Sequence, residues 1–221
     1  MRWQTIEDLA LVQLGSTEAL EARLPAVTAK TELARLPDRF FLSTMTRRIF
    51  QAGMTHRVIN ERWPFFEEYF WGFEPEKLAL LSEDQLERAM QETRLIRHFG
   101  KLRTIPVNAS IMLDVSRQAG GFGRWLADWP DEDIVGLWRT LAKQFERLGG
   151  QSGPRFLRLA GRDTFFLNND VVAALINLEI IPDKPSGRKA QEAVNRHFVD
   201  WMAESGRPMA HLSRILSLTV G

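Results

Sequence analysis

A glycine-rich turn is the first feature of this sequence that could do chemistry. It lies in "RLGGQSGPRFLRLAGRDTFFLNNDVV", residues 147–172, where Gly149, Gly150 and Gly153 interrupt a helical pattern. Glycines let the backbone turn tightly and leave its N–H groups uncovered. A helix that begins there adds unpaired N–H donors and the positive end of its dipole. We therefore predict that the amides of Gly150, Ser152 and Gly153 bind an anion.

Basic residues surround this turn. Between residues 139 and 162 a single acidic residue, Glu146, faces the following basic ones: Arg139, Lys143, Arg147, Arg155, Arg158 and Arg162. The net charge of the chain is only +1, so the patch is local. The chain has neither a GxxxxGK[ST] motif nor a βαβ pattern, and nucleic-acid phosphates are therefore the anions that fit best, with Arg155 and Arg158 as their partners. The plainer alternatives are a helix–helix turn and a solvated helix face.

A polar cluster follows the turn. Asn168, Asn169 and Asp170 directly precede the apolar run "VVAALINL". An aspartate can act as a general base, which an asparagine cannot do. An aspartate before an apolar helical run is also well placed to cap that helix, and for Asp170 we favour capping.

The elements that position these residues are predicted to be helices. Apolar residues recur at three- and four-residue spacing and strand alternation is scarce, so we expect an all-α fold of about ten helices. A break is expected at Pro64, and a turn rather than a helix at 121–133. The expected helices cover residues 4–14, 17–24, 39–52, 55–70, 74–81, 82–92, about 100–120, 131–149, 153–161, 170–180, 187–203 and 207–217.

Composition narrows the classes of protein. The 221 residues suffice for one domain or two closely packed lobes. The absence of cysteine excludes disulfides, thiolate metal sites and cysteine catalysis, and the four histidines lack metal-ligand spacing, so no metal is expected. No apolar run approaches the roughly 20 residues of a membrane span, and acidic residues interrupt the N-terminal apolar stretch. We expect a cytoplasmic monomer that does not contact membranes.

Three blocks of sequence resemble the DNA-3-methyladenine glycosylase I family, which belongs to the helix-hairpin-helix DNA glycosylase superfamily. They are "FQAGMTHRVI" (50–59), "FEPEKLALLSEDQLERAMQETRLIRHFGKLRTIPVNA" (73–109) and "NNDVVAAL" (168–175). The middle block is the most specific, because its motifs follow the family's order and spacing without a gap. The resemblance implies a helix-hairpin-helix glycosylase fold of two closely packed helical lobes at 39–221, preceded by a helical extension at 1–38.

The resemblance also implies an activity. Such enzymes flip an alkylated purine out of double-stranded DNA and hydrolyse its N-glycosidic bond. The positive charge of 3-methyladenine makes it a good leaving group, so no cofactor is expected. Better-known members hold a zinc ion with cysteine and histidine. That zinc site cannot form here, because the chain has no cysteine.

Several residues match the family's site. Gln51, Ala52 and Gly53 correspond to its "QAG" motif, and Gln51 is expected in the base pocket. Met54, beside Gly53, falls where the family places an apolar side chain that fills the gap left by the flipped base. Core packing is the alternative role for Met54. Asp170 corresponds to the aspartate of an "ND" pair and is the candidate catalytic base.

Two pocket positions depart from the family. Arg48 stands where the family has a glutamate that contacts the damaged base, and His56 where it has a tryptophan that stacks on it. An arginine facing a cationic base is repulsive in a dry pocket. Either Arg48 points away, to a carboxylate or a phosphate, or the preferred lesion is not cationic. His56 can stack on a base or be a hydrogen-bonded structural residue, and Phe40 can wall the pocket or pack in the core.

Other polar and aromatic residues are open to two interpretations. Their basic members, which either reach DNA phosphates or form an exposed helix face, are Arg94, Arg97, His98 and Lys101. Trp125, Trp129 and Trp138 are expected in the core or between lobes rather than as a stacking platform.

Three functions are consistent with these residues. The leading one is a DNA repair glycosylase that excises an alkylated purine of the 3-methyladenine type. The missing glutamate and tryptophan favour a rival, a non-catalytic helix-hairpin-helix protein that binds damaged or distorted DNA. A helical partner-binding protein ranks last, because it does not explain the glycine turn with its arginines.

Overall fold

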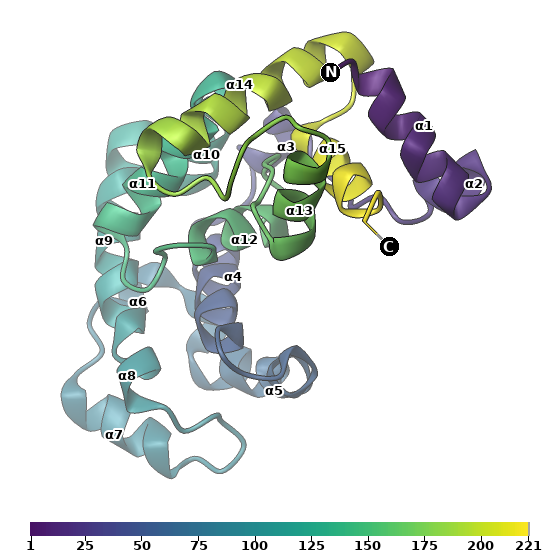
Figure 1. Cartoon of the computed structure of the whole chain (residues 1–221). Coiled ribbons are helices and arrows are strands. Elements are labelled where there is room, and N and C mark those ends of the chain that lie inside the picture. Colours follow the sequence, from purple (N-terminus) through teal and green to yellow (C-terminus); the bar gives the residue numbers. More distant parts are fainter. Residues whose placement is uncertain (221) are drawn as a thin grey trace. The chain divides into compact units, whose positions relative to one another are not determined.

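The computed structural model describes residues 1–220 and is helical (Figure 1). No strand occurs in this range, which confirms the all-α prediction. The α-helices are α1 (Trp3–Leu14), α2 (Thr17–Glu21), α3 (Lys30–Leu33), α4 (Asp38–Gln51), α5 (His56–Tyr69), α6 (Pro75–Leu78), α7 (Glu83–Gln91), α8 (Phe99–Leu102), α9 (Thr104–Ala119), α10 (Phe122–Asp128), α11 (Ile134–Gln144), α12 (Ser152–Leu159), α13 (Asn169–Asn177), α14 (Arg188–Ser205) and α15 (Met209–Ser217). Short 3-10 helices cover Trp71–Phe73 and Asp131–Asp133. None of these helices is long and apolar enough to cross a membrane.

The helices form two compact units, each built from separate stretches of chain. The central unit comprises Ala29–Asp128 and Arg139–Arg162. The terminal unit comprises Met1–Thr28, Trp129–Trp138 and the chain from Asp163 onward. The first helices therefore pack with the last ones, as α1 does with α14 and α15. That residues 1–38 act as a separate extension of a domain at 39–221 stays a prediction.

Within the terminal unit, charged residues join the chain ends. The Arg207 guanidinium lies 2.6 Å from Glu7 Oε1 and 2.7 Å from Glu21 Oε1. The backbone N–H of Trp3 donates to Glu204 Oε2 at 2.9 Å. Because Arg207 and Glu7 are both largely buried, these contacts hold α1 and α2 to the C-terminal helices more firmly than exposed ion pairs do.

The core of the central unit forms around α4. This helix packs against α5, α9, α10 and α12, and almost every residue from Phe41 to Gln51 is buried. Helix α4 is buried on all sides rather than along one face, because neighbouring helices surround it. A cavity lies at its C-terminal end.

The expected break at Pro64 is wrong. Helix α5 continues from His56 to Tyr69 with Pro64 inside it. Trp63 and Phe66, which flank the proline, stack with ring centroids 4.8 Å apart, and Phe66 lies 4.9 Å from Phe50 of α4. This aromatic packing offsets the backbone hydrogen bond that a proline removes.

The expected turn at 121–133 is also partly wrong, because residues 122–128 form α10. Its buried face contains Phe122, Gly123 and Leu126. Phe122 N–H donates to Asp38 Oδ1 at 2.9 Å, and the ring of Phe122 packs on Phe41 with centroids 5.5 Å apart. The apolar residues here have helical spacing, but the clustered glycines and aromatic residues favoured the prediction of a turn.

Several helix ends are fixed by local caps. Ser16 Oγ accepts a hydrogen bond from the Ala19 N–H at 3.1 Å, and Ser82 forms a reciprocal capping box with Gln85. Gly120 ends α9 in the left-handed conformation, with φ of 74°. These signals are reliable because a cap satisfies backbone groups through residues adjacent in sequence.

The approach of α10 to its neighbours makes Gly123 indispensable. A Cβ atom there would lie 2.4 Å from the Leu33 carbonyl oxygen and 2.9 Å from a Phe41 ring carbon. We expect Gly123→Ala to lower the free energy of unfolding by about 1–3 kcal/mol, as overpacking of a core does. Urea denaturation measures this change.

Gly149→Ala is the matched control, because a Cβ there meets nothing within 4 Å and its φ is not in the left-handed region. We expect that control to stay within about 0.5 kcal/mol of the parent protein. Equal effects of the two substitutions would contradict the packing described for α10.

Candidate nucleic-acid site

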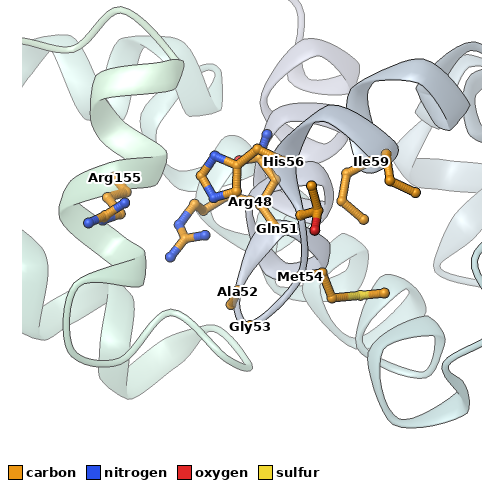
Figure 2. Close-up of a pocket in the computed structure, with 10 residues that line it drawn as sticks. Arg48, Gln51, Ala52, Gly53, Met54, His56, Ile59 and Arg155 are labelled. Carbon is orange, nitrogen blue, oxygen red and sulfur yellow. The ribbon is translucent and has the colours of Figure 1, made fainter.

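A cavity of about 660 Å³ opens in the central unit at the C-terminal end of α4 (Figure 2). Its volume is typical of a small-molecule site. Most of its lining comes from the end of α4, the following loop and the start of α5, and one residue comes from α12. The lining residues are Arg48, Gln51, Ala52, Gly53, Met54, Thr55, His56, Val58, Ile59 and Arg155.

The loop between α4 and α5 gives the cavity its shape. Helix α4 ends at Gln51, Gly53 adopts φ of 72°, and α5 begins at His56. The Gln51 side chain is buried and donates from Nε2 to Asn60 Oδ1 at 3.0 Å. This bond orients the amide of Gln51 at the cavity wall, so the predicted pocket position of Gln51 agrees with the geometry.

Lys101 supports this loop through two hydrogen bonds to its backbone. Its Nζ donates to the carbonyl oxygens of Phe50, at 3.0 Å, and Ala52, at 2.7 Å. Lys101 is buried, and burial lowers its pKa, with further lowering by the charges of Arg147 and Arg48. The alternatives considered for Lys101, a phosphate contact or an exposed helix face, are therefore wrong: its ammonium group caps the last carbonyls of α4.

Arg48 lies at the cavity without an acidic partner. Only 7% of the residue is exposed, and its Nε and Nη1 have no hydrogen-bond partner within residues 1–220. Its side chain extends toward the helix that carries Arg155 (Figure 2). Burial lowers the pKa of Arg48, and the charge of Arg155 lowers it further. Of the alternatives for Arg48, pairing with a carboxylate is wrong.

Met54 and His56 lie at the exposed side of the same loop. Met54 is 36% exposed, which excludes a core-packing role. His56 is exposed as the first residue of α5, and within the described chain its side chain makes no hydrogen bond. The structural role considered for His56 therefore has no contact to support it.

Phe40 does not line this cavity. It lies with Ser43, Arg47 and Glu67 at a second, smaller cavity of about 370 Å³. Phe40 precedes Gln51 by three helical turns, and a rise of about 1.5 Å per residue separates them by roughly 16 Å along α4. The pocket-wall role expected for Phe40 is therefore not compatible with this helix.

The glycine turn connects α11 to α12, as expected. Gly150 adopts φ of 57°, and the turn closes through a bond from Ser152 N–H to the Gly149 carbonyl at 3.1 Å. The Ser152 amide is thus already used, a correction to its expected role as an anion donor. In the part of the chain that the structure describes, the amides of Gly150 and Gly153 have no such backbone partner.

The arginines after the turn separate into different roles. Arg155 lines the cavity and Arg158 is half-buried on α12. Arg162 is 1% exposed and donates from Nε to the Leu126 carbonyl at 2.9 Å, so it supports α10 and cannot contact DNA. Arg94, another candidate phosphate contact, pairs with Glu92 at 3.2 Å.

The remaining predicted residues also have defined places. Residues 92–98 form a turn rather than a helix, so Arg97 and His98 are exposed on a loop. Trp138 is buried and donates from Nε1 to Thr164 Oγ1 at 3.0 Å, which confirms a core role for it. Trp125 and Trp129 are half-buried.

The polar cluster belongs to the terminal unit, and its capping residue was predicted incorrectly. Asn168, not Asp170, is the N-cap of α13: its Oδ1 accepts from the Val171 N–H at 3.0 Å. Asp170 is exposed in the first turn of α13. Asparagine and aspartate cap equally well, so the sequence alone could not distinguish Asn168 from Asp170 as the N-cap.

Comparisons with known proteins identify the fold. The fold is that of the helix-hairpin-helix DNA glycosylases. A solved 3-methyladenine DNA glycosylase I from Staphylococcus aureus matches with a TM-score of 0.51 at 23% identity, over 57% of this chain and 77% of that one. The Methanocaldococcus jannaschii 8-oxoguanine glycosylase/lyase in complex with DNA matches with a TM-score of 0.57 at 12% identity, over 96% and 95%.

The family itself follows from the sequence comparison. The methyladenine glycosylase family model matches residues 36–147, half of the chain, and the chain belongs to that family. Its relatives include the DNA-3-methyladenine glycosylase 1 of Escherichia coli K12, 31% identical over 72 residues, and the DNA-3-methyladenine glycosylase of Haemophilus influenzae, 29% identical over 76. The matched segments span 33% and 34% of this chain, but only 38% and 41% of those relatives.

Sequence reasoning missed two contributors to the cavity. Arg155 was expected to bind phosphate beside the turn, but not to share a cavity with Arg48. Lys101 was not expected to support the loop. In neither case was there a local signal, because each contact joins residues that are far apart in the chain.

Lys101→Met tests the support of the loop. We expect the free energy of unfolding to fall by about 2 kcal/mol, since charge-assisted hydrogen bonds to two carbonyls are lost. Hydrogen exchange of the 52–55 amides should accelerate. Lys143→Met, at an exposed position of α11, is the control, and equal protection of 52–55 in both variants would contradict this role.

The cap of α13 gives a second test. Asn168→Ala should lower the free energy of unfolding by about 1 kcal/mol in both low and high salt, because it removes a hydrogen bond. Asp170→Asn should have a smaller effect that disappears in about 1 M salt, because it removes only a charge near the helix dipole. A larger loss for Asp170→Asn in high salt would reverse the two roles.

Proposed function

We propose that this chain is a DNA glycosylase that flips an alkylated purine of the 3-methyladenine type out of double-stranded DNA and excises it. The observation that carries the proposal is the cavity built by the family's "QAG" segment, with Gln51 oriented in its wall. Its volume of about 660 Å³ accommodates a nucleobase. Met54, which is exposed at the edge of the cavity, is proposed to fill the gap left in the duplex.

The grip on DNA is proposed to lie at the glycine turn. Within residues 1–220 the amides of Gly150 and Gly153 have no backbone partner, and Arg155 and Arg158 follow them on α12. Backbone N–H groups and arginines are common donors to DNA phosphates. One chain supplies every residue that lines the cavity, and we propose that the protein acts as a monomer in the cytoplasm.

The proposed reaction is a hydrolysis. The bond between C1′ of the deoxyribose and the base nitrogen breaks, and its electron pair leaves with the base, so that a cationic alkylpurine departs neutral. The oxygen of water bonds to C1′, and the water loses a proton. The Asp170 carboxylate, which the sequence leads us to expect as the acceptor of that proton, is exposed at the start of α13 in the terminal unit, and its role as a base stays a prediction. His56 and Gln51 are proposed to hold the base.

The test is base release from methylated duplex DNA under single-turnover conditions with excess enzyme. We expect the parent protein to release an alkylated purine. Gln51→Leu, which cannot hydrogen-bond the base, should slow release about tenfold or more, the equivalent of about 1.4 kcal/mol of transition-state stabilisation. Arg57→Gln, an exposed change on α5, is the control and should act as the parent does.

The same measurement distinguishes a glycosylase from the rival function, a non-catalytic DNA-binding protein. No released base, together with salt-dependent binding to lesion duplexes, would identify a non-catalytic DNA-binding protein. Release by the parent protein that Gln51→Leu leaves unchanged would show that the base occupies another site.

A further inference from the structure

The cavity is positively charged and contains no carboxylate. Two of its lining residues, Arg48 and Arg155, carry guanidinium groups, and the others are neutral or histidine. Cavities for cationic ligands are lined by acidic or aromatic groups, because like charges repel strongly where water is excluded. The charge of this cavity therefore indicates an anionic occupant in at least part of it.

Arg48 is the more demanding of the two arginines. It is 93% buried by difference from its 7% exposure, and the buried Nε and Nη1 have no partner within residues 1–220. A buried charge without a hydrogen-bond partner costs several kcal/mol. A protein retains such a group at a cavity when a ligand completes its hydrogen bonds.

Arg155 brings a second charge to the same cavity from α12. The two guanidinium groups destabilise each other, and this repulsion contributes to the lowered pKa of Arg48. Figure 2 shows the Arg48 side chain directed to the side of the cavity where Arg155 lies. An anion between them reduces the repulsion and supplies acceptors for the unpaired Nε and Nη1 of Arg48, a geometry that suits the oxygens of a phosphate.

We propose that Arg48 and Arg155 together bind a DNA backbone phosphate that adjoins the flipped nucleotide, inside the cavity rather than on the outer surface. This inference rests on the proposed function, in that a flipped nucleotide must enter the cavity. It also explains how an arginine can occupy the position of the family's glutamate. A phosphate neutralises one of the two positive charges and shields the base from them, whereas an uncharged base leaves both in place.

The test uses duplexes that contain a tetrahydrofuran abasic site, so that no base is present. In one series each flanking phosphate in turn is replaced by an uncharged methylphosphonate. We expect the parent protein to lose about tenfold in affinity for one of these replacements, measured by fluorescence anisotropy. Arg48→Gln and Arg155→Gln should bind the phosphodiester duplex more weakly and no longer discriminate against the same methylphosphonate.

The salt dependence provides an independent measurement. Each variant should lower the slope of log Kd against log salt by about one, as expected for one lost phosphate contact. Arg57→Gln is the matched control, because it removes an exposed arginine of α5 outside the cavity and should keep the sensitivity to methylphosphonate. Arg155→Gln changes a half-buried residue and serves if Arg48→Gln does not fold.

Three outcomes would overturn the inference. One is equal affinity of the parent protein for all the duplexes. Another is persistent methylphosphonate discrimination in both variants. The third is calorimetric binding of inorganic phosphate that depends on Arg48 while the methylphosphonates have no effect, which would assign the site to a free phosphoryl compound. Since abasic duplexes need no excision, a protein that passes this test but releases no base refutes only the proposed glycosylase activity.

Discussion

The contact on which the site depends is the one between the Lys101 ammonium group and the last carbonyls of α4. A helix that ends in a buried place leaves carbonyl oxygens without partners, and α4 ends among the packed helices of the central unit. Lys101 donates to Phe50 and Ala52, so the helix can stop at Gln51 without burying unpaired groups. Everything that shapes the cavity follows from that end: the oriented Gln51, the left-handed Gly53 and the exposed Met54.

The second constraint is electrostatic. Burial lowers the pKa of Lys101 and of Arg48, the charge of Arg48 lowers that of Lys101 further, and the charge of Arg155 lowers that of Arg48 further. Such a concentration of positive charge is unfavourable in the free protein and becomes favourable when a polyanion binds. The same region thereby combines a cavity of about 660 Å³ with a concentration of positive charge. Arg48 contributes most to this balance, because its buried side chain has no acidic partner within residues 1–220.

Much of the fold was predictable because its signals are local. Ser16 and Ser82 cap their helices and Gly120 ends α9, since each satisfies backbone groups a few residues away. Pro64 was misjudged because aromatic packing between α4 and α5 outweighs its backbone cost. Residues 122–128 were misjudged because the helix is stabilised by burial against Phe41 rather than by its propensity. The cap of α13 was assigned to Asp170 instead of Asn168, because asparagine and aspartate cap equally well and only the backbone geometry distinguishes them.

For the candidate site, the sequence alone determined the all-α class, the glycine turn, the basic patch around it and the "QAG" segment, because each is written in adjacent residues. Only the tertiary structure decided which arginines line the cavity and which support the fold. Arg162 became a buried support of α10, Arg155 came to line the cavity, and Arg48 was buried there without an acid. The physical reason is that burial and charge pairing arise from contacts between distant segments, and the spacing of residues along one helix carries no record of them.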